Sequence, residues 1–321
     1  MSVFAGFDLG GTRLKYGLID SDLRVLYQNS EGTPQSSEEL VELLHRSWID
    51  LKYRTPERIA AAGFGFPGLF SRDEQRILQA PNCPSIENLP LVPELERFVD
   101  RPFHLDNEAN FAAYGEYRDG AGKGAHSLVL LTIGTGIGTG IILEGRIWRG
   151  ACGFAGELGH APVNPDGEPC RCGSLGCLET EVSAVRIVQN YQVSQRGLVQ
   201  LTAREVHRRA EQGDPAAVEA FRRAGHFLGK GIATAVNMLN PERVILGGGV
   251  MEAEELLLLP AIREARRRSY HGAFECCSIR KAEMENDAGF IGAAIYARDN
   301  SPGKNKSGGS PTESGGGGFQ R

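Results

Sequence analysis

The sequence predicts an α/β protein built from two similar lobes, and three observations support this fold class. An apolar strand, a glycine-rich turn and two further strands follow one another near the N-terminus, and the same order returns after residue 127. Helical patterns alternate with the later strands in both halves. The chain has 321 residues, which is enough for one large or two moderate domains with substantial cores.

The first half begins with three short segments rich in strand-forming residues, VFAGFDL, LKYGLID and LRVLYQN. Ser36 and Ser37, followed by two glutamates, predict the start of a helix. The apolar segment IAAAGFGFPG predicts a buried strand that ends in a Gly-Pro-Gly turn. A second helix is expected from about Asn110 to Tyr117, and it leads into a glycine-rich junction between the halves.

The second half repeats the opening pattern with the segments SLVLLTIG, GIILEG and RIWRG. Asp214 and Pro215 form a good helix start, and the apolar stripe that follows predicts a long helix ending at Asn240. The segment RVILGGGV predicts a strand that runs into three glycines, and residues 289–297 predict a short apolar helix. The tail at 301–321 is rich in glycine and serine, so we expect it to be disordered.

Composition and charge argue against some classes of protein. The net charge is −5 and the isoelectric point about 5.9, so no broad basic surface for a nucleic acid is expected. The arginines between residues 263 and 268 are explained by an exposed helix face. The N-terminus lacks the pattern of a signal peptide, and no segment approaches ~18 uninterrupted apolar residues. We therefore expect a cytoplasmic protein without a membrane or nucleic-acid partner.

The chain has seven cysteines, and a reducing compartment disfavours structural disulfides among them. Cys83, Cys152, Cys276 and Cys277 are expected to be small buried residues. The other three lie in the segment GELGHAPVNPDGEPCRCGSLGCLE, with a histidine ten residues before the first.

That segment predicts a metal site formed by His160, Cys170, Cys172 and Cys177. One nitrogen and three thiolate sulfurs suit tetrahedral zinc with four protein ligands and no open position. Surface thiols beside an unrelated histidine are the alternative. A closed site indicates a structural role for the zinc, and its second role would be to fix the orientation of the imidazole.

Two glycine-rich turns follow apolar strands, and neither is a common nucleotide-binding loop. No Walker A sequence is present, and Thr139 stands where the third glycine of the dinucleotide fingerprint belongs. Glycine lets backbone N–H groups approach a phosphate, and a threonine hydroxyl adds a donor. An aspartate at a strand end, such as Asp8, can hold magnesium through water. Either turn alone could belong to an ordinary hairpin, but two at equivalent positions predict a phosphate clamp between the lobes.

The segments DLGGT, GTGIGTG, AGELGH, CRCGSLGCLE and NPERVILGGG together resemble the ROK family (repressor, open reading frame, kinase), a branch of the actin-like sugar kinase superfamily. The resemblance covers residues 3 to about 298. It implies two ribonuclease-H-like (actin-like ATPase) lobes around a central cleft where ATP, Mg²⁺ and a hexose meet, with the zinc loop in the second lobe. We expect the lobes to be 1–118, completed by the helix 288–298, and 119–287. The family also suggests a homodimer.

The resemblance assigns contacts to individual residues. The nucleotide contacts that it implies are Asp8, Gly10, Gly11 and Thr12 in the first turn, Thr135, Gly136 and Gly138 in the second, and Gly247 and Gly248 near the adenosine. The sugar contacts that it implies are Asn82, Asn107, Glu157, His160 and Glu179.

The catalytic base is the point at which this chain departs from the family pattern. Kinases of the family usually carry Asn-Asp at the lobe junction, whereas this chain has Asn107-Glu108. Glutamate keeps the carboxylate and adds one methylene. We predict Glu108 as the base, because base function needs a carboxylate within hydrogen-bond reach. Asp106 is the alternative, since it would point to the same side if the chain were extended there.

The predicted function is an ATP-dependent hexose kinase that transfers the γ-phosphate to the 6-hydroxyl of glucose. An N-acetylhexosamine or fructose would fit the same motifs. A transcriptional repressor is disfavoured, because only seven residues precede Asp8 and leave no room for a helix-turn-helix domain. A catalytically silent sugar-binding or sensor protein remains an alternative, because some repressors of the family have a similar Asn-Glu pair.

Overall fold

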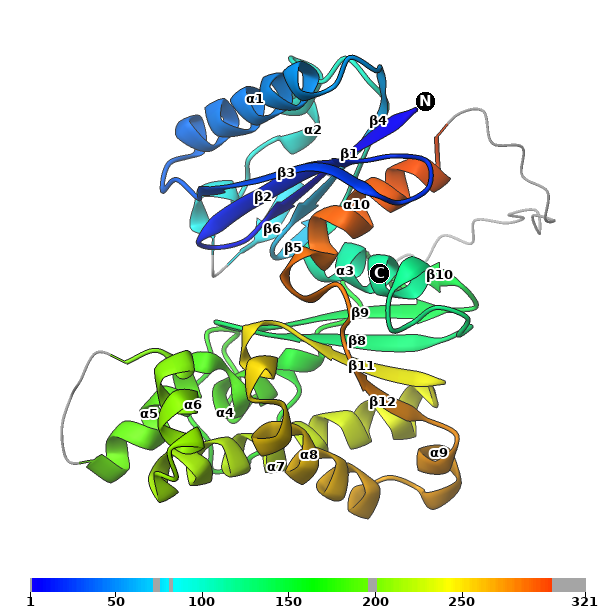
Figure 1. Ribbon diagram of the computed structural model, residues 1–321. Helices are drawn as coiled ribbons and strands as arrows, with labels where there is room; N and C mark the ends of the chain where they lie inside the picture. Colours follow the sequence, from blue (N-terminus) through cyan, green and yellow to red (C-terminus); the bar gives the residue numbers. More distant parts are fainter. Residues whose placement is uncertain (1, 72–75, 81–82, 196–200, 302–321) are drawn as a thin grey trace, which may run out of the picture.

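Two five-stranded sheets with the same strand order form the frame of the protein (Figure 1). The structure is a computed structural model that describes residues 2–71, 76–80, 83–195 and 201–301. Asn82 and residues 302–321 of the predicted tail lie outside the described residues. The strands of the first sheet, in spatial order, are β3 (Val25–Gly32), β2 (Arg13–Ile19), β1 (Val3–Leu9), β4 (Ile59–Phe66) and β7 (Phe103–Asn107). Those of the second are β10 (Arg146–Ile147), β9 (Ile137–Leu143), β8 (Leu128–Ile133), β11 (Arg243–Gly247) and β12 (Ser278–Lys281).

The pairing within the two sheets is equivalent. In each, the first strand along the chain pairs antiparallel with the second and parallel with the fourth in chain order. A tight turn can join only antiparallel neighbours, so each glycine-rich turn connects the first and second strands of its sheet. The internal repeat predicted from the sequence is therefore confirmed, and the two glycine turns occupy equivalent positions.

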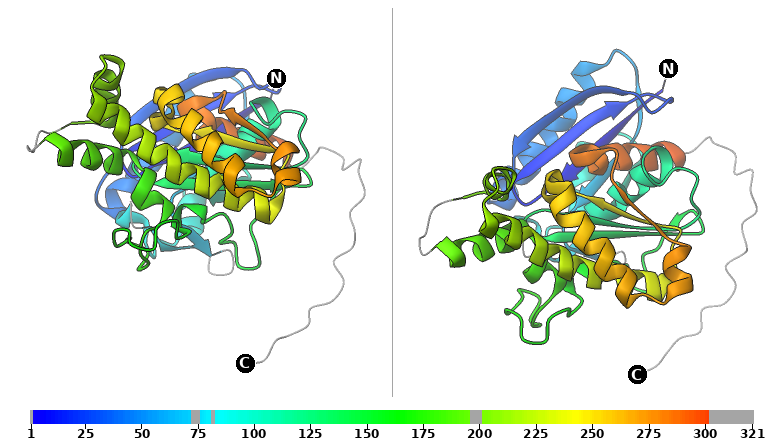
Figure 2. Two further views of the ribbon diagram at one scale, coloured as in Figure 1. Left: turned by 90° about the horizontal axis from the view of Figure 1, so that it is seen from below. Right: turned by 60° about the horizontal axis from the view of Figure 1, so that its bottom comes forward.

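Further helices cover the outer face of each sheet (Figures 1 and 2). On the first sheet these are α1 (Ser37–Arg54) and α2 (Leu91–Glu96). Beside the second sheet lie α4 (Leu178–Val182), α5 (Ala184–Gln195), α6 (Ala203–Glu211), α7 (Pro215–Leu239), α8 (Glu254–Arg268) and α9 (His271–Glu275). A small hairpin, β5 (Leu69–Ser71) and β6 (Arg76–Gln79), borders the first sheet. Short 3₁₀ turns occur at Pro84–Ile86, Leu158–His160, Gly249–Ala253 and Glu285–Asp287.

The predicted helix starts are confirmed by their capping contacts. The Ser36 hydroxyl accepts a hydrogen bond from the backbone N–H of Glu39 at 3.2 Å, and α1 begins at the next residue. The Asp214 carboxylate accepts from the N–H of Ala216 at 2.9 Å, with Pro215 as the first residue of α7. These side chains satisfy N–H groups that have no partner within the helix.

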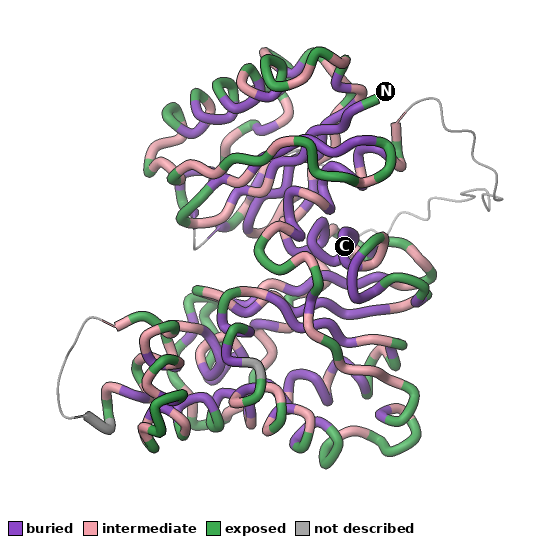
Figure 3. Tube along the Cα trace, in the orientation of Figure 1, coloured by how far each residue is buried: buried purple, intermediate pink, exposed green. Residues whose placement is uncertain are grey.

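Two helices lie between the sheets and join them. The helix α3 (Glu108–Asp119) packs on β8 and β9 of the second sheet, and α10 (Ala288–Asp299) packs on β1 and β4 of the first. Buried residues run through both sheets and through this helix pair (Figure 3). Each helix follows the fifth strand of one sheet yet lies on the other sheet.

The packing around α10 is close enough to exclude side chains. A Cβ on Gly63 would lie 2.2 Å from the carbonyl oxygen of Ala293, and one on Gly292 would lie 1.8 Å from that of Phe111. The backbone of α10 therefore contacts both β4 and α3 directly.

A buried carboxylate forms hydrogen bonds with both segments that connect the two lobes, the one after α3 and the one before α10. Glu116 of α3 has no exposed surface. Its two oxygens accept hydrogen bonds from the N–H groups of Ala121, Glu283 and Met284, at 2.8, 3.2 and 2.7 Å. Ala121 lies on the first segment, and the other two lie on the second. Both connections are thus held against the same helix.

Some expectations need correction. Cys152 and Cys276 are exposed rather than buried, because they lie on a loop and at the end of the short helix α9. Cys83 is buried as expected. The arginines of α8 lie on an exposed helix face, which confirms that interpretation. Across the described ranges, every helix is too short or too polar to traverse a lipid bilayer.

Replacement of Gly292 by alanine should destabilise the protein by about 1–3 kcal/mol, because the new Cβ would overlap the Phe111 carbonyl and push α10 away from α3. The matched control is Gly272→Ala in α9, where a Cβ would meet no atom within 4 Å. That variant should be neutral or up to about 1 kcal/mol more stable. Urea unfolding measures both, and equal stabilities of the two variants would contradict the close contact.

Candidate active site

A cavity of about 490 Å³ lies between the two sheets and collects most of the predicted site residues. Its wall contains both glycine turns, the start of α3, the segment before the cysteine loop and the glycines after β11. The predicted residues that line it are Gly10, Gly11, Thr12, Asn107, Glu108, Thr135, Gly136, Gly138, Glu157, His160, Glu179 and Gly248. Two predicted contacts among the described residues are not part of this wall. Asp8 lies beneath the first glycine turn, and Gly247 lines a smaller adjoining hollow, where its neighbour is Ala282.

Asp8 stands at the end of β1, directly beneath the first glycine turn. A Cβ on Gly289 would lie 2.2 Å from its carboxylate, so α10 packs tightly against it. Burial raises the pKa of Asp8 to about 6; the positive charge of Lys15 opposes this shift, and the negative charge of Asp287 adds to it. Such a carboxylate fits a divalent cation, which would favour its charged form.

Glu108 is the first residue of α3 and faces the cavity. Its Oε1 would lie 3.9 Å from a Cβ on Gly138, so it reaches the second glycine turn. Its Oε2 is buried and, within the described part of the chain, accepts no hydrogen bond. Burial and the charge of Asp8 raise the pKa of Glu108 to about 8. A carboxylate with such a pKa can accept a proton near neutral pH, which is the property that a general base needs.

The alternative base, Asp106, has different surroundings from Glu108. The strand β7 ends at Asn107 and helix α3 begins at once, so residues 106 and 108 do not share an extended stretch. The Asp106 carboxylate is buried and accepts a hydrogen bond from Arg149 at 2.7 Å. It borders a separate small crevice, outside the cavity wall that holds Glu108.

Four predicted sugar contacts, Asn107, Glu157, His160 and Glu179, line the cavity and form one corner of it. Glu157 is 44% exposed and directs its carboxylate to His160 Nε2, 3.8 Å away. Loss of hydration against the cavity wall raises the pKa of Glu157. The charge of His160 lowers this pKa, and the charge of Glu179 raises it. Glu179 accepts a hydrogen bond from the N–H of Ile137 at 2.8 Å, so it also holds the second glycine turn. Asn107 caps α3 through Ala109 N–H at 2.9 Å and donates to the carbonyl of Gly68 at 3.2 Å.

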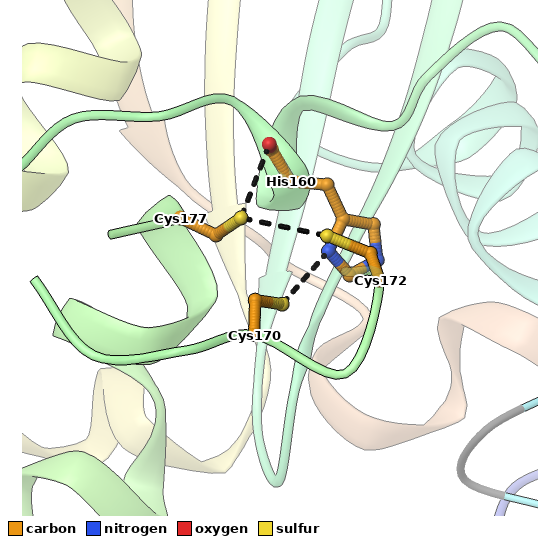
Figure 4. Close-up of side chains that lie close together, drawn as sticks. All are labelled: His160, Cys170, Cys172 and Cys177. Carbon is orange, nitrogen blue, oxygen red and sulfur yellow. Dashed lines mark hydrogen bonds between the residues drawn. The ribbon is translucent and has the colours of Figure 1, made fainter. Parts of the chain in front are cut away.

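The side chains of His160, Cys170, Cys172 and Cys177 converge behind this corner (Figure 4). Their candidate ligand atoms all lie within 4.8 Å of one another. Cys170 Sγ is 3.5 Å from His160 Nδ1, and Cys172 Sγ is 3.6 Å from Cys177 Sγ. A tetrahedron with metal–sulfur bonds of about 2.3 Å requires ligand separations of about this size. Burial and the neighbouring thiols raise the pKa of Cys177 to about 12, so its thiolate needs a cation beside it.

Sequence reasoning did not single out several residues of the cavity wall. Arg171, between two cysteines of the cluster, and Asn286, before α10, both line the cavity. Neither stands in a motif whose chemistry identifies it, and only the fold brings them to the site. Gly153, Ala155 and Gly156, just before Glu157, also line the wall.

Two equivalent sheets, each with a glycine turn facing a shared cavity, define an actin-like ATPase fold. The ROK family model matches residues 4–300, and the chain belongs to the ROK family. A glucokinase of Streptomyces coelicolor is 31% identical over 318 residues, with 94% of this chain and 99% of the relative covered. A xylose repressor of Caldicellulosiruptor bescii is 30% identical, with 79% of this chain and 66% of the repressor covered.

A solved structure has the same fold over nearly the whole chain. It is a ROK family glucokinase from Streptomyces griseus in complex with glucose and AMPPNP. The identity is 32% and the TM-score 0.83, and the match covers 92% of this chain and 99% of that one.

Replacement of Glu108 by glutamine should stabilise the protein increasingly as the pH rises. The pKa of Glu108 is about 8 in the folded protein, against an ordinary value of 4.5. The folded protein favours the protonated form of Glu108. The stability that this form contributes is therefore fully present below about pH 4.5 and is lost as the pH rises through 8. Glutamine carries no charge, so the melting temperature of Glu108→Gln should match wild type near pH 5 and exceed it by a few degrees at pH 8.

Glu42→Gln on the exposed face of α1 is the matched control, and its difference from wild type should be small at every pH. A difference for Glu108→Gln that is the same at pH 5 and pH 8 would contradict the raised pKa.

Proposed function

We propose that the chain is an ATP-dependent hexose kinase that transfers the γ-phosphate of ATP to the 6-hydroxyl of glucose. One observation carries this proposal: the carboxylate of Glu108, whose pKa is raised, shares a cavity with both glycine turns and with the predicted sugar contacts. The glucokinase relatives and the glucose and AMPPNP in the S. griseus structure support the same substrates. N-acetylhexosamines and fructose are the competing acceptors.

In this proposal the acceptor sugar binds in the corner formed by Asn107, Glu157, His160 and Glu179. Carboxylates accept hydrogen bonds from paired hydroxyls, and His160 Nε2 points toward Glu157 rather than toward the thiols. The 6-hydroxyl then lies near Glu108, which accepts its proton as the oxygen attacks phosphorus. Asn82 is a further proposed contact.

The phosphates of ATP bind to backbone N–H groups of the two turns, with Gly10, Gly11 and Thr12 on one side and Thr135, Gly136 and Gly138 on the other. Gly247 and Gly248 lie on the proposed adenosine side. Asp8 would hold Mg²⁺ through water, and the ion would screen the phosphate charge. Positioning and charge neutralisation are what phosphoryl transfer chiefly requires from a protein.

We further propose that His160, Cys170, Cys172 and Cys177 hold a structural zinc ion. The four side chains would hold the ion, which would neutralise the thiolates. With Nδ1 of His160 on the cysteine side, Nε2 would keep one orientation toward the sugar corner. The proposal also includes two lobes. One consists of 1–118 completed by 288–298, and the other of 119–287. We further propose a cytoplasmic location and a homodimer.

An ADP-release assay across a panel of hexoses tests the kinase proposal. Wild type should be fastest with glucose, and Glu108→Gln should lose about two to four orders of magnitude in kcat because no base remains. Its dissociation constant for the sugar, measured by calorimetry, should change little. Glu108→Asp should retain activity. Wild type that binds a hexose tightly yet phosphorylates none would favour the sensor alternative.

Elemental analysis of protein purified without chelator tests the zinc proposal. Wild type should contain about one zinc per chain, and Cys172→Ser should lose it and bind the sugar more weakly. Cys276→Ser, which changes an exposed cysteine outside the cluster, should keep the metal. Zinc-free wild-type protein would contradict the proposal.

A further inference from the structure

Arg149 links the second sheet to the strand end that carries the proposed base. It lies two residues after β10, so its backbone continues from the hairpin of the second sheet. Its Nε donates a hydrogen bond to Asp106 Oδ2 at 2.7 Å, and its Nη2 donates to the hydroxyl of Tyr296 on α10 at 3.2 Å. The guanidinium also lies 5.5 Å from the centre of the Tyr296 ring. Its Nη1 donates to the carbonyl of Ile147 on β10 at 3.5 Å, so one side chain contacts β7, α10 and its own hairpin.

The Asp106 carboxylate in turn holds the turn from which Glu108 projects. Its Oδ1 accepts from the N–H of Asn107 and from Asn110 Nδ2, both at 2.8 Å. Asn107 then caps α3, whose first residue is Glu108. Asp106 is only 6% exposed, and the Arg149 guanidinium is the cation paired with it. Loss of that partner would leave a buried, unpaired carboxylate one residue before the base.

The backbone of Arg149 also reaches the sugar corner. Its carbonyl oxygen accepts a hydrogen bond from the N–H of Ala155 at 3.0 Å. Ala155 lines the cavity two residues before Glu157. The side chain of Arg149 thus contacts Asp106, near the proposed base, while its backbone carbonyl holds the loop that leads to the sugar contacts.

We propose that Arg149 is a positioning residue of the phosphoryl transfer, which acts through Asp106 to hold Glu108 in line with the acceptor hydroxyl. The inference rests on the proposed function. A misplacement of about 1 Å at a reacting group can cost about a hundredfold in rate. The guanidinium is suited to this task because its planar donors fix an orientation, whereas a lysine would supply only a point charge.

The chain offers a control in a second ion pair that involves α10. Arg118 of α3 pairs with Asp299 of α10, and Tyr114 donates to that carboxylate at 2.9 Å. This half-buried ion pair also joins α3 to α10 but lies ten residues along α3 from Glu108. Arg118→Met should therefore cost stability without disturbing the base.

Steady-state kinetics of Arg149→Met, Arg149→Lys, Asp106→Asn, the Arg149→Met/Asp106→Asn double variant and Arg118→Met test the proposal. Arg149→Met should lower kcat about 10- to 100-fold with hexose and ATP KM values within about threefold of wild type. Arg149→Lys should recover part of the loss. The double variant should be no slower than the worse single variant, because both act through one contact. Arg118→Met should keep kcat within about twofold.

Hydrogen exchange of the segment 103–112 gives a readout that needs no turnover. Exchange should be faster in Arg149→Met and Asp106→Asn than in wild type, and unchanged in Arg118→Met. If wild type phosphorylates glucose but Arg149→Met keeps its kcat, or Arg118→Met loses as much, the positioning role is overturned while the kinase proposal stands. If wild type phosphorylates no hexose, the kinase proposal fails, and unchanged exchange in Arg149→Met would then overturn the positioning role on its own.

Discussion

Direct backbone contact around α10 is the constraint on which the rest of the structure depends. Gly63 and Gly292 bring the helix against β4 and α3 with no side chain between the backbones. Because packed interiors deform little, the distance between the sheets is fixed by this contact. Asp8 meets the N-terminal end of α10, and Glu108 begins α3. The positions of both acids therefore follow from how closely the helices approach.

This arrangement holds charged groups where water is scarce, and the protein gives up some stability to do so. Burial raises the pKa of both Asp8 and Glu108, and the charge of Asp8 raises that of Glu108 further. One oxygen of Glu108 has no partner among the described residues. Asp106, two residues from Glu108, is fully satisfied by contrast. Buried polar groups normally find partners, so an unsatisfied oxygen facing a cavity is typical of a site prepared for a ligand. The difference between the two neighbouring acids separates a reactive group from a structural one.

The sequence predicted much of this fold because its signals are local. Each glycine turn follows an apolar strand, and Ser36 and Asp214 start their helices by contacts within three residues. The cysteine cluster was predictable because three of its ligands lie within eight residues and their chemistry is specific. By contrast, nothing local marks Arg149 as the partner of Asp106, since 43 residues separate them. The misassigned Cys152 and Cys276 show the same limit, because exposure depends on tertiary packing.

The exchange of helices between the two halves has a consequence for how the chain can be divided. The helix after the fifth strand of each half lies on the sheet of the other half, which is the geometry of two identical units that have swapped their last elements. A cut between the halves would leave each sheet with the wrong helix and an uncovered apolar face. Neither half can then serve as an independent module, although each contains a complete set of strands. A gene fusion or domain exchange that uses this fold would therefore have to transfer both halves as one unit.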